Sequence, residues 1–318
     1  MQKVLFIINP MSGTGRQKRM IENYAREFLP AADFELHFSY TEYAGHAIQL
    51  SNNARNIFDI VVAVGGDGTI HEVAQPLVHS NTTLAIIPMG SGNGLSRFLH
   101  IPLSIRPAIR LIAEGRKMQM DTILCNNEYV LNIAGFGFDA VIGDLFNINV
   151  TKRGGLKYVH LVSKELFHYK PQTFTFNSEN KEFTRTFFIG AIANANQYGL
   201  NAHIAPTADV TDGKFEVVFI EKFPPLFTLK LAIDLFTNRI HKSRYVETLQ
   251  VDSLTIQNAR PYTIHMDGEP RVMYSDINFS IAPQSLTVIA GEKKELPLTA
   301  IARKTRNILA HEEIHIHD

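Results

Sequence analysis

Up to about residue 117, the chain alternates short apolar runs with longer stretches of helical spacing. This pattern predicts strands at 3–8, 34–39, 60–64 and 84–87, and helices at 17–29, 46–56, from 69 onward, up to 98 and at 107–113. The run IVVAV at 60–64 is apolar throughout, which is typical of a strand in a sheet covered on both faces. We therefore predict an α/β domain with a doubly wound, mostly parallel sheet.

From about residue 118 the pattern changes to aromatic and β-branched runs. These runs lie at 128–133, 173–177, 183–192, 215–220, 245–256, 262–266, 273–281 and 286–289. The Asp-Gly pairs at 212–213 and 267–268 are typical of hairpin turns. We predict a β-rich, antiparallel, sandwich-like domain over 118–292, interrupted by helices at 156–169 and 226–236. Whether the tail, 293–318, packs back on the first domain stays open.

The length and amino-acid composition of the chain exclude several classes of protein. The 318 residues suffice for two domains, and 45% hydrophobic content excludes wholesale disorder. Lys and Arg number 31, as do Asp and Glu, so the zero net charge disfavours a nucleic-acid partner. The single Cys125 excludes an internal disulfide and a cysteine-based zinc site, which fits the cytoplasm. No stretch is typical of a signal peptide or a membrane span; peripheral contact with a membrane and a homodimer stay open.

Three glycine-rich segments each follow a predicted strand. They are NPMSGTG at 9–15, GGDGT at 65–69 and PMGSGNG at 88–94. Glycines let backbone N–H groups approach a phosphate closely, and the N-terminus of the following helix favours negative charge. Each segment alone is an ordinary turn. Because all three lie at the carboxyl ends of parallel strands, they are expected to meet at one edge of the sheet and to form a nucleotide site.

The middle glycine segment carries polar residues with two interpretations. Thr69 and Glu72 have the spacing of a capping box, which predicts a helix that starts at Thr69. Asp67 is out of place beside phosphates unless it holds Mg²⁺ or a ribose, or accepts a proton. The alternative is a well-capped structural turn without a ligand.

In the second half, two acidic segments also have two interpretations. Asp267 and Glu269, in MDGE, are either solvated residues of a hairpin turn or a catalytic pair. The segment DVTDGK at 209–214 is either a hairpin or a loop for a hard cation. Cys125 is interpreted as a core residue. The scattered histidines, His71 among them, show no metal-ligand spacing.

In this order, the motifs resemble those of the diacylglycerol kinase catalytic-domain superfamily. They are NPMSG at 9–13, Thr41 followed by GHA at 45–47, GGDGTIHEV at 65–73, MGSGNGLSR at 89–97, NIAGFGFDA at 132–140, TDGKF at 211–215 and MDGE at 266–269. The segment GGDGT is shared with NAD kinases and phosphofructokinases. The segment MDGE, when it follows the other motifs in this order, is more specific to the lipid kinases. The resemblance is closest to the small soluble bacterial lipid kinases.

The resemblance implies a nucleotide-binding domain over 1–117, a lipid-substrate domain over 118–292 and an active site in the cleft between them. It also implies ATP, Mg²⁺ and phosphoryl transfer to a lipid hydroxyl at a membrane surface. The third glycine segment, with Ser91 and Asn93, is more similar to that of sphingosine kinases than to that of many diacylglycerol kinases. The lipid that accepts the phosphoryl group therefore stays open between a glycerolipid such as diacylglycerol and a sphingoid base. An NAD kinase-like activity and a non-catalytic nucleotide- or lipid-binding regulator are the alternatives.

The resemblance also assigns roles to residues. The nucleotide is expected to contact Asn9, Pro10, Ser12, Gly13, Thr41, Gly65, Gly66, Asp67, Gly68, Thr69, Glu72, Gly90, Ser91 and Asn93. Asp267 and Glu269 fall on the catalytic pair, one of which accepts the hydroxyl proton, and Asp67 is a third catalytic carboxylate. Asp209, Asp212 and Lys214 fall on a structural Mg²⁺ site, with Lys214 contributing its main-chain oxygen because an ammonium group cannot coordinate a cation.

Overall fold

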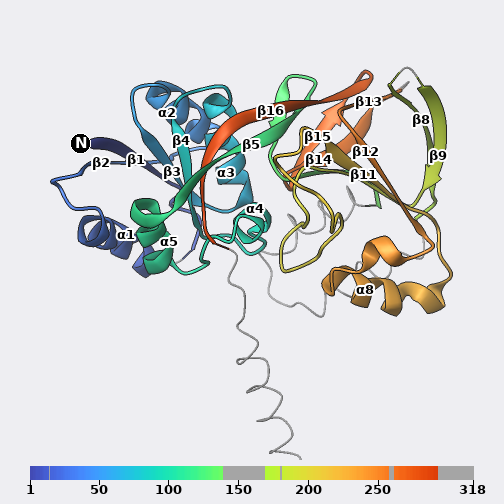
Figure 1. The fold of residues 1–318 in the computed structure, drawn as a ribbon, viewed down its shortest axis with the longest axis horizontal. Coiled ribbons are helices and arrows are strands. Elements are labelled where there is room, and N and C mark those ends of the chain that lie inside the picture. Colours follow the sequence, from blue (N-terminus) through green and yellow to red (C-terminus); the bar gives the residue numbers. More distant parts are fainter. Residues whose placement is uncertain (14, 139–168, 180, 258–260, 293–318) are drawn as a thin grey trace, which may run out of the picture.

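The computed structural model describes residues 1–13, 15–138, 169–179, 181–257 and 261–292. Figure 1 shows two lobes side by side, an α/β lobe that carries the N-terminus and a β-rich lobe. The predicted helix at 156–169 lies outside the described residues except for its last residue, and the tail lies wholly outside them. No helix in the described part of the chain is long and apolar enough to cross a membrane.

The α/β lobe contains the predicted doubly wound parallel sheet. Its strands run in the order β2 (Phe34–Tyr40), β1 (Gln2–Ile8), β3 (Ile60–Gly65) and β4 (Thr83–Pro88). The helices are α1 (Gly15–Phe28), α2 (His46–Ala54), α3 (Asp67–Ala74), α4 (Gly94–Phe98) and α5 (Ile105–Glu114), and η1 (Gln75–Leu77) follows α3. The helices α1 and α5 pack together, as do α2 and α3. Every residue of β3 and β4 is buried, which confirms a sheet covered on both faces.

The β-rich lobe is a sandwich of antiparallel sheets, as predicted. One sheet has the order β12 (Val246–Val251), β11 (Phe215–Ile220), β10 (Ile189–Ala193), β7 (Ile133–Gly137), β14 (Tyr262–Met266) and β15 (Glu269–Met273). The facing layer includes β13 (Ser253–Ile256), β8 (Gln172–Ser178) and β9 (Lys181–Phe187). Buried phenylalanines, among them Phe136, Phe176, Phe187 and Phe219, fill the space between the sheets. The segment η2 (Pro225–Phe227), α8 (Thr228–Phe236) and η3 (Ile240–Lys242) packs at one end.

Two long strands join the lobes. Strand β16 (Ile277–Ala290) pairs with β5 (Arg116–Cys125) along most of its length, and β6 (Glu128–Val130) pairs with β5 in turn. The first part of β16 pairs with β13, whereas Val288 near its end pairs with Leu84 of β4. The parallel sheet of the first lobe therefore continues into the second lobe as one ten-stranded sheet.

Several sequence-based expectations differ from the structure. Helix α3 begins at Asp67, and the capping box is wrong. The Thr69 hydroxyl instead accepts a hydrogen bond from Asn9 Nδ2 at 2.9 Å, and Glu72 accepts one from the Gly45 N–H at 3.0 Å. The helix is thus tied to neighbouring loops. The runs 128–133, 183–192 and 245–256 each form two strands, because β6 and β7, β9 and β10, and β12 and β13 belong to different sheets. The runs 273–281 and 286–289 instead lie mostly in the single strand β16.

Candidate active site

The glycine segments after β1, β3 and β4 meet at one edge of the sheet. The Asn9 N–H donates to Val64 O at 3.0 Å, and the Met89 N–H donates to Gly65 O at 2.7 Å. A Cβ atom on Gly90 would lie 2.7 Å from Gly66 Cα. The second and third glycine loops therefore touch backbone to backbone, which only glycine at position 90 allows.

A cavity of about 520 Å³ opens beside these loops. Its lining includes eight residues of the expected nucleotide set together with Glu269, namely Asn9, Pro10, Ser12, Thr41, Gly66, Gly68, Thr69 and Glu72. Glu269 belongs to β15 of the other lobe, and its Oε1 lies so close to Gly68 that a Cβ there would meet it at 2.5 Å. The structure thus brings a carboxylate of the second lobe onto the glycine loops of the first, in a cavity of the size that small-molecule sites have.

The third glycine loop lines a second cavity, of about 550 Å³. Gly90, Ser91 and Asn93 border it together with side chains of α1 and the region of α5. Three further expected residues, Gly13, Gly65 and Asp67, line neither cavity. Gly65 packs beneath Thr69, whose Cβ would lie 2.4 Å from a Cβ on Gly65, and Gly13 adopts a left-handed turn with φ 67°.

Asp67 points toward the third glycine loop. Its Oδ2 accepts a hydrogen bond from the Asn93 N–H at 2.9 Å, and its Oδ1 accepts one from the Gly94 N–H at 3.0 Å, at the start of α4. Burial raises the pKa of Asp67 to about 6; the two N–H donors act against this, and the nearby Asp267 carboxylate adds to it. A carboxyl group with such a pKa can exchange a proton near neutral pH.

Asp267 is buried at the turn between β14 and β15. Its Oδ1 accepts hydrogen bonds from the N–H groups of Asn132 and Ile133, at 2.8 and 3.2 Å. Its Oδ2 is bonded to the Leu131 N–H at 3.0 Å and to His71 Nδ1 at 2.8 Å. Four partners fill the acceptor positions of one carboxylate, so none is left for a substrate. Asp267 therefore fastens the turn that carries Glu269.

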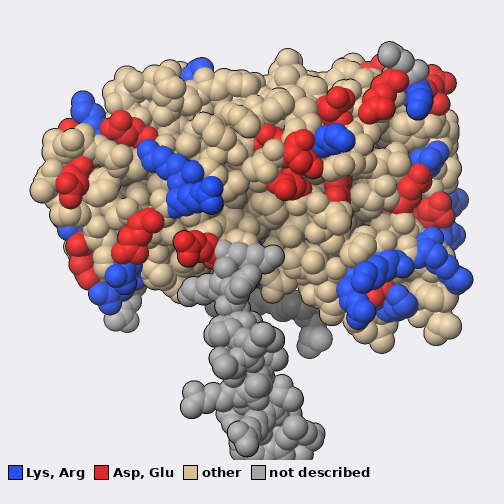
Figure 2. All heavy atoms as spheres, in the orientation of Figure 1, with Lys and Arg blue, Asp and Glu red and all other residues tan. Residues whose placement is uncertain are grey.

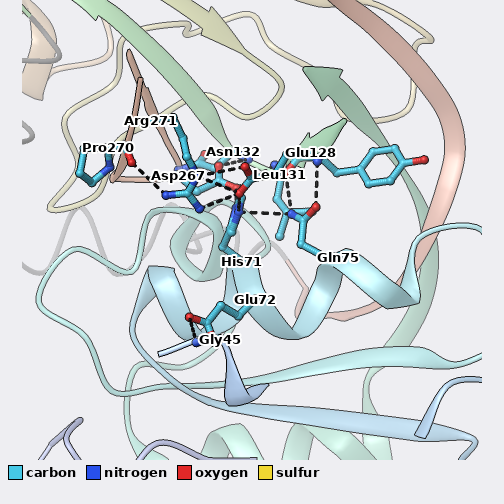
Figure 3. A network of polar contacts seen from close by, with 11 residues as sticks. Gly45, His71, Glu72, Gln75, Glu128, Leu131, Asn132, Asp267, Pro270 and Arg271 are labelled. Carbon is cyan, nitrogen blue, oxygen red and sulfur yellow. Dashed lines mark hydrogen bonds and ion pairs between the residues drawn. The ribbon is translucent and has the colours of Figure 1, made fainter. Parts of the chain in front are cut away.

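His71 joins the two lobes through a chain of alternating charges (Figure 3). On α3, it lies between Asp267 and Glu128, whose Oε1 is 2.7 Å from Nε2. Arg271 binds Glu128 with two of its nitrogens, at 2.6 and 2.9 Å. Burial lowers the pKa of His71, but the hydrogen bonds to the two carboxylates outweigh it and raise the pKa to about 9. Burial likewise acts to raise the pKa of Glu128, but His71 and Arg271 outweigh it and lower the pKa to about 2.

The charge network escaped sequence reasoning. His71 was one of several histidines without metal-ligand spacing, and its partners lie 57 and 196 residues away. No local pattern connects residues at such separations. The one available signal was the position of His71 inside the GGDGTIHEV motif, on the same helix as Asp67.

The charge network around His71 is expected to make the free energy of unfolding fall as the pH rises above 6.5. The folded-state pKa of His71 is raised from 6.5 to about 9, so its contribution is complete below pH 6.5 and is lost as the pH rises through 9. Relative to H71Q, the wild-type protein is expected to lose on the order of 2 kcal/mol of unfolding free energy across this range. Urea unfolding at several pH values measures this loss. H37Q, at a half-exposed histidine, is the control, and parallel profiles for wild type and H71Q would contradict the assignment.

The expected metal ligands at 209–214 engage their own loop. Asp209 Oδ1 accepts hydrogen bonds from the Thr211 N–H and hydroxyl, at 3.0 and 2.7 Å. Asp212 accepts one from the Lys214 N–H at 2.9 Å and one from Gln250 Nε2 at 2.7 Å. Within the described ranges, no three His, Cys, Asp or Glu side chains are grouped so as to hold a metal ion. A structural Mg²⁺ at this loop stays a prediction.

The same loop is fastened to the candidate active site by two buried polar residues. Asp121 accepts a hydrogen bond from the Gly213 N–H at 2.8 Å. Asn194 Nδ2 donates to the carbonyl oxygens of Asp121 and Leu131, at 2.8 and 2.9 Å. Because the Leu131 N–H in turn binds Asp267, the 209–214 loop indirectly supports the turn that carries Glu269. Sequence reasoning missed Asp121 and Asn194, which are single polar residues beside apolar runs.

The fold and the site define a class of two-lobed proteins, in which glycine loops of an α/β lobe face carboxylates of a β-sandwich lobe. Residues 3–125 match the model of the diacylglycerol kinase catalytic domain, and residues 132–290 match the YegS C-terminal NAD kinase β-sandwich-like domain. The chain belongs to the family of diacylglycerol kinases and YegS-like lipid kinases. The resemblance inferred from the motifs is confirmed.

Individual relatives cover most of the chain. A protein of Chromohalobacter salexigens named "Probable lipid kinase YegS-like" is 27% identical over 74% of this chain and 77% of its own length. The diacylglycerol kinase of Bacillus subtilis is 25% identical over 85% of this chain and 90% of its own length. A crystal structure of a diacylglycerol kinase from Bacillus anthracis superposes with a TM-score of 0.69 at 20% identity and covers 91% of this chain and 97% of its own. This last likeness concerns the fold.

Proposed function

We propose that the protein transfers the γ-phosphoryl group of ATP to a hydroxyl group of a membrane lipid, either diacylglycerol or a related glycerolipid, or a sphingoid base. The observation that carries the proposal is the cavity in which Glu269 of the β lobe faces the glycine loops of the α/β lobe. Family membership supports the kinase chemistry, and the names of the relatives support a lipid acceptor.

The α/β lobe would hold the nucleotide. Backbone N–H groups of the glycine loops and the N-terminus of α3 would bind the phosphates. Mg²⁺ fits the donor set, because it takes one or two carboxylates beside phosphate oxygens. Glu72 and Glu269 line the cavity and Asp67 lies between the second and third loops, so hard oxygen donors are present. When bound, Mg²⁺ neutralises charge on the triphosphate.

Glu269 is the proton acceptor in this proposal. Asp267 has its oxygens occupied by four partners, whereas the Glu269 carboxylate lines the cavity and forms no hydrogen bond with another described residue. As the lipid oxygen bonds to the γ-phosphorus, its proton passes to Glu269 and the bond from phosphorus to the bridging oxygen of ADP breaks. His71 and Asp267 hold the turn on which Glu269 sits.

Asp67 is expected to set the acid side of the activity profile. Its pKa of about 6 means that the carboxylate becomes protonated just below neutral pH. D67N is expected to lower kcat by about a hundredfold and to remove the fall in activity near pH 6. Steady-state kinetics from pH 5 to 8 measures both effects. D59N is the control, because Asp59 also accepts a backbone N–H, from Lys3, but lies away from the cavity. An unchanged acid limb in D67N would remove Asp67 from the mechanism.

The proposal as a whole is tested by incubating the purified chain with γ-labelled ATP and Mg²⁺ in separate mixtures that contain dispersed diacylglycerol, monoacylglycerol, sphingosine or NAD. Nucleotide binding is measured separately by titration. Labelled phospholipid is expected from at least one of these lipids. If NAD alone is labelled, the protein is an NAD kinase. If nucleotide binds but no acceptor is labelled, the protein is a non-catalytic nucleotide-binding regulator, and either outcome contradicts the proposal.

A further inference from the structure

The segment of η2 and α8 exposes a row of large apolar side chains. Leu226, Leu229, Ile233 and Phe236 are 88%, 72%, 53% and 56% exposed. The last three lie at helical spacing and so share one side of α8. The opposite side is packed, because Leu231 is buried and Leu235 joins a core cluster of the β lobe.

Apolar residues on both sides of a surface helix require an explanation. A single exposed leucine is ordinary, but several on one short segment mark an interaction surface. The hydrophobic effect favours burial of the apolar side chains on the outer side of α8, as it does for those on the inner side. Among the described residues, none provides that cover, because all four side chains are at least half exposed. We call these four residues the α8 face.

Basic side chains surround the α8 face. Between residues 221 and 244 the sequence contains five Lys or Arg, namely Lys222, Lys230, Arg239, Lys242 and Arg244, and two acidic residues, Glu221 and Asp234. The difference, five minus two, is a local charge of +3 in a chain whose net charge is zero. Figure 2 shows the blue side chains gathered at the lower right, where Figure 1 places α8. Lys230 is ion-paired with Asp234, and all five basic residues are exposed.

We propose that the α8 face docks on the surface of an anionic phospholipid bilayer. Aliphatic and aromatic side chains of a short helix would enter the boundary between headgroups and acyl chains, and the flanking Lys and Arg would contact the lipid phosphates. The charge of the segment is complementary to that surface. The functional role of this docking rests on the proposed lipid kinase activity. The docking itself is measured as binding to vesicles, without any phosphoryl transfer.

The α8 face is connected to the candidate active site by one segment of chain. The His203 N–H donates to Leu235 O at the end of α8, at 3.0 Å. A few residues earlier, the Leu200 N–H donates to Gly92 O of the third glycine loop at 3.3 Å, and Gly199 pairs with Asn93. In Figure 1 this segment runs between α4 and α8. Docking at α8 therefore holds the glycine loops at a fixed place relative to the bilayer that supplies the acceptor.

Sedimentation with vesicles tests the docking surface. The full chain is mixed with vesicles of phosphatidylcholine alone or with phosphatidylglycerol added. The wild-type protein is expected to bind the anionic vesicles and to dissociate at high salt. L229Q/F236Q is expected to bind at least about tenfold more weakly, and R239Q/K242Q about fivefold more weakly for each charge removed. I57Q and K117Q, at exposed positions of the other lobe, are the matched controls and are expected to bind as the wild type does.

Activity separates this proposal from the proposed function. On vesicle-borne lipid, both α8 variants are expected to lose turnover in proportion to binding, whereas turnover of a short-chain, water-soluble lipid stays unchanged. Vesicle binding without any phosphoryl transfer would contradict the kinase and leave the docking intact. Equal binding by wild type and both α8 variants would overturn the docking. Conversion of a dimer into monomers by L229Q/F236Q in size-exclusion chromatography would also overturn it, in favour of a second copy of this chain.

Discussion

Replacing Glu269 by Gln is expected to lower kcat for lipid phosphorylation by at least about a thousandfold, because the amide cannot accept the hydroxyl proton. The side chain keeps its size and its place against Gly68, so the fold is expected to be unchanged. Nucleotide affinity is expected to stay within about threefold, since the phosphates bind mainly to the glycine loops. Single-turnover transfer from labelled ATP, together with nucleotide titration, separates the two quantities.

A surface carboxylate provides the matched control for Glu269. Glu114 forms an exposed ion pair with Arg110 one helical turn away, and E114Q is expected to leave activity unaltered. E269D, which keeps the charge but shortens the side chain, is expected to retain more activity than E269Q. If E269Q works within about tenfold of the wild type, the proton goes elsewhere and this part of the mechanism is wrong.

Replacing Asp267 by Asn is expected to cause the largest loss of stability, about 3 to 5 kcal/mol, together with at least a hundredfold loss in kcat. The Asn amide has one oxygen, so the donors at Oδ2, the Leu131 N–H and the His71 imidazolium, lose their acceptor. The left-handed backbone at this position, φ 51°, suits Asn and is therefore not the cause of the loss. Urea unfolding at neutral pH measures the change.

A double-mutant cycle with His71 identifies the cause. If the loss in D267N comes from the broken charge network, adding H71Q to D267N is expected to cost much less than H71Q costs in the wild type. Asp121 supplies a matched control, because it is also a buried carboxylate that accepts backbone N–H groups, and no histidine of the described residues is bonded to it. Additive losses for D267N and H71Q would contradict the proposed coupling. A coupling free energy between H71Q and D121N as large as that between H71Q and D267N would also contradict it.

Local patterns were sufficient for the strands of the α/β lobe and for the glycine loops. The run IVVAV followed by GGDGT reports a buried strand and a sharp turn, and both signals lie within ten residues of each other. Parallel strands in turn require that their carboxyl ends share one edge, so the meeting of Asn9, Gly66 and Gly90 followed from topology alone. The family motifs placed MDGE in the cleft, and its Glu269 lines the cavity.

Long-range pairing was beyond the sequence patterns. Nothing near Val288 indicates that the last part of β16 returns to the first lobe and pairs with Leu84. Nothing near His71 indicates that two carboxylates from the other lobe hold it, and MDGE alone does not show that Asp267 is saturated while Glu269 faces the cavity. These features depend on contacts between segments far apart in the chain, which local periodicity does not encode.

The most direct measurement is a crystal structure with a non-hydrolysable ATP analogue and Mg²⁺. The central claim is that the triphosphate lies on the glycine loops and points at Glu269 across the cleft. We expect the terminal phosphate inside the cavity lined by Asn9, Gly68 and Glu269, with room for a hydroxyl group between phosphorus and the Glu269 carboxylate. A nucleotide bound elsewhere, or one whose terminal phosphate points away from Glu269, would contradict the claim.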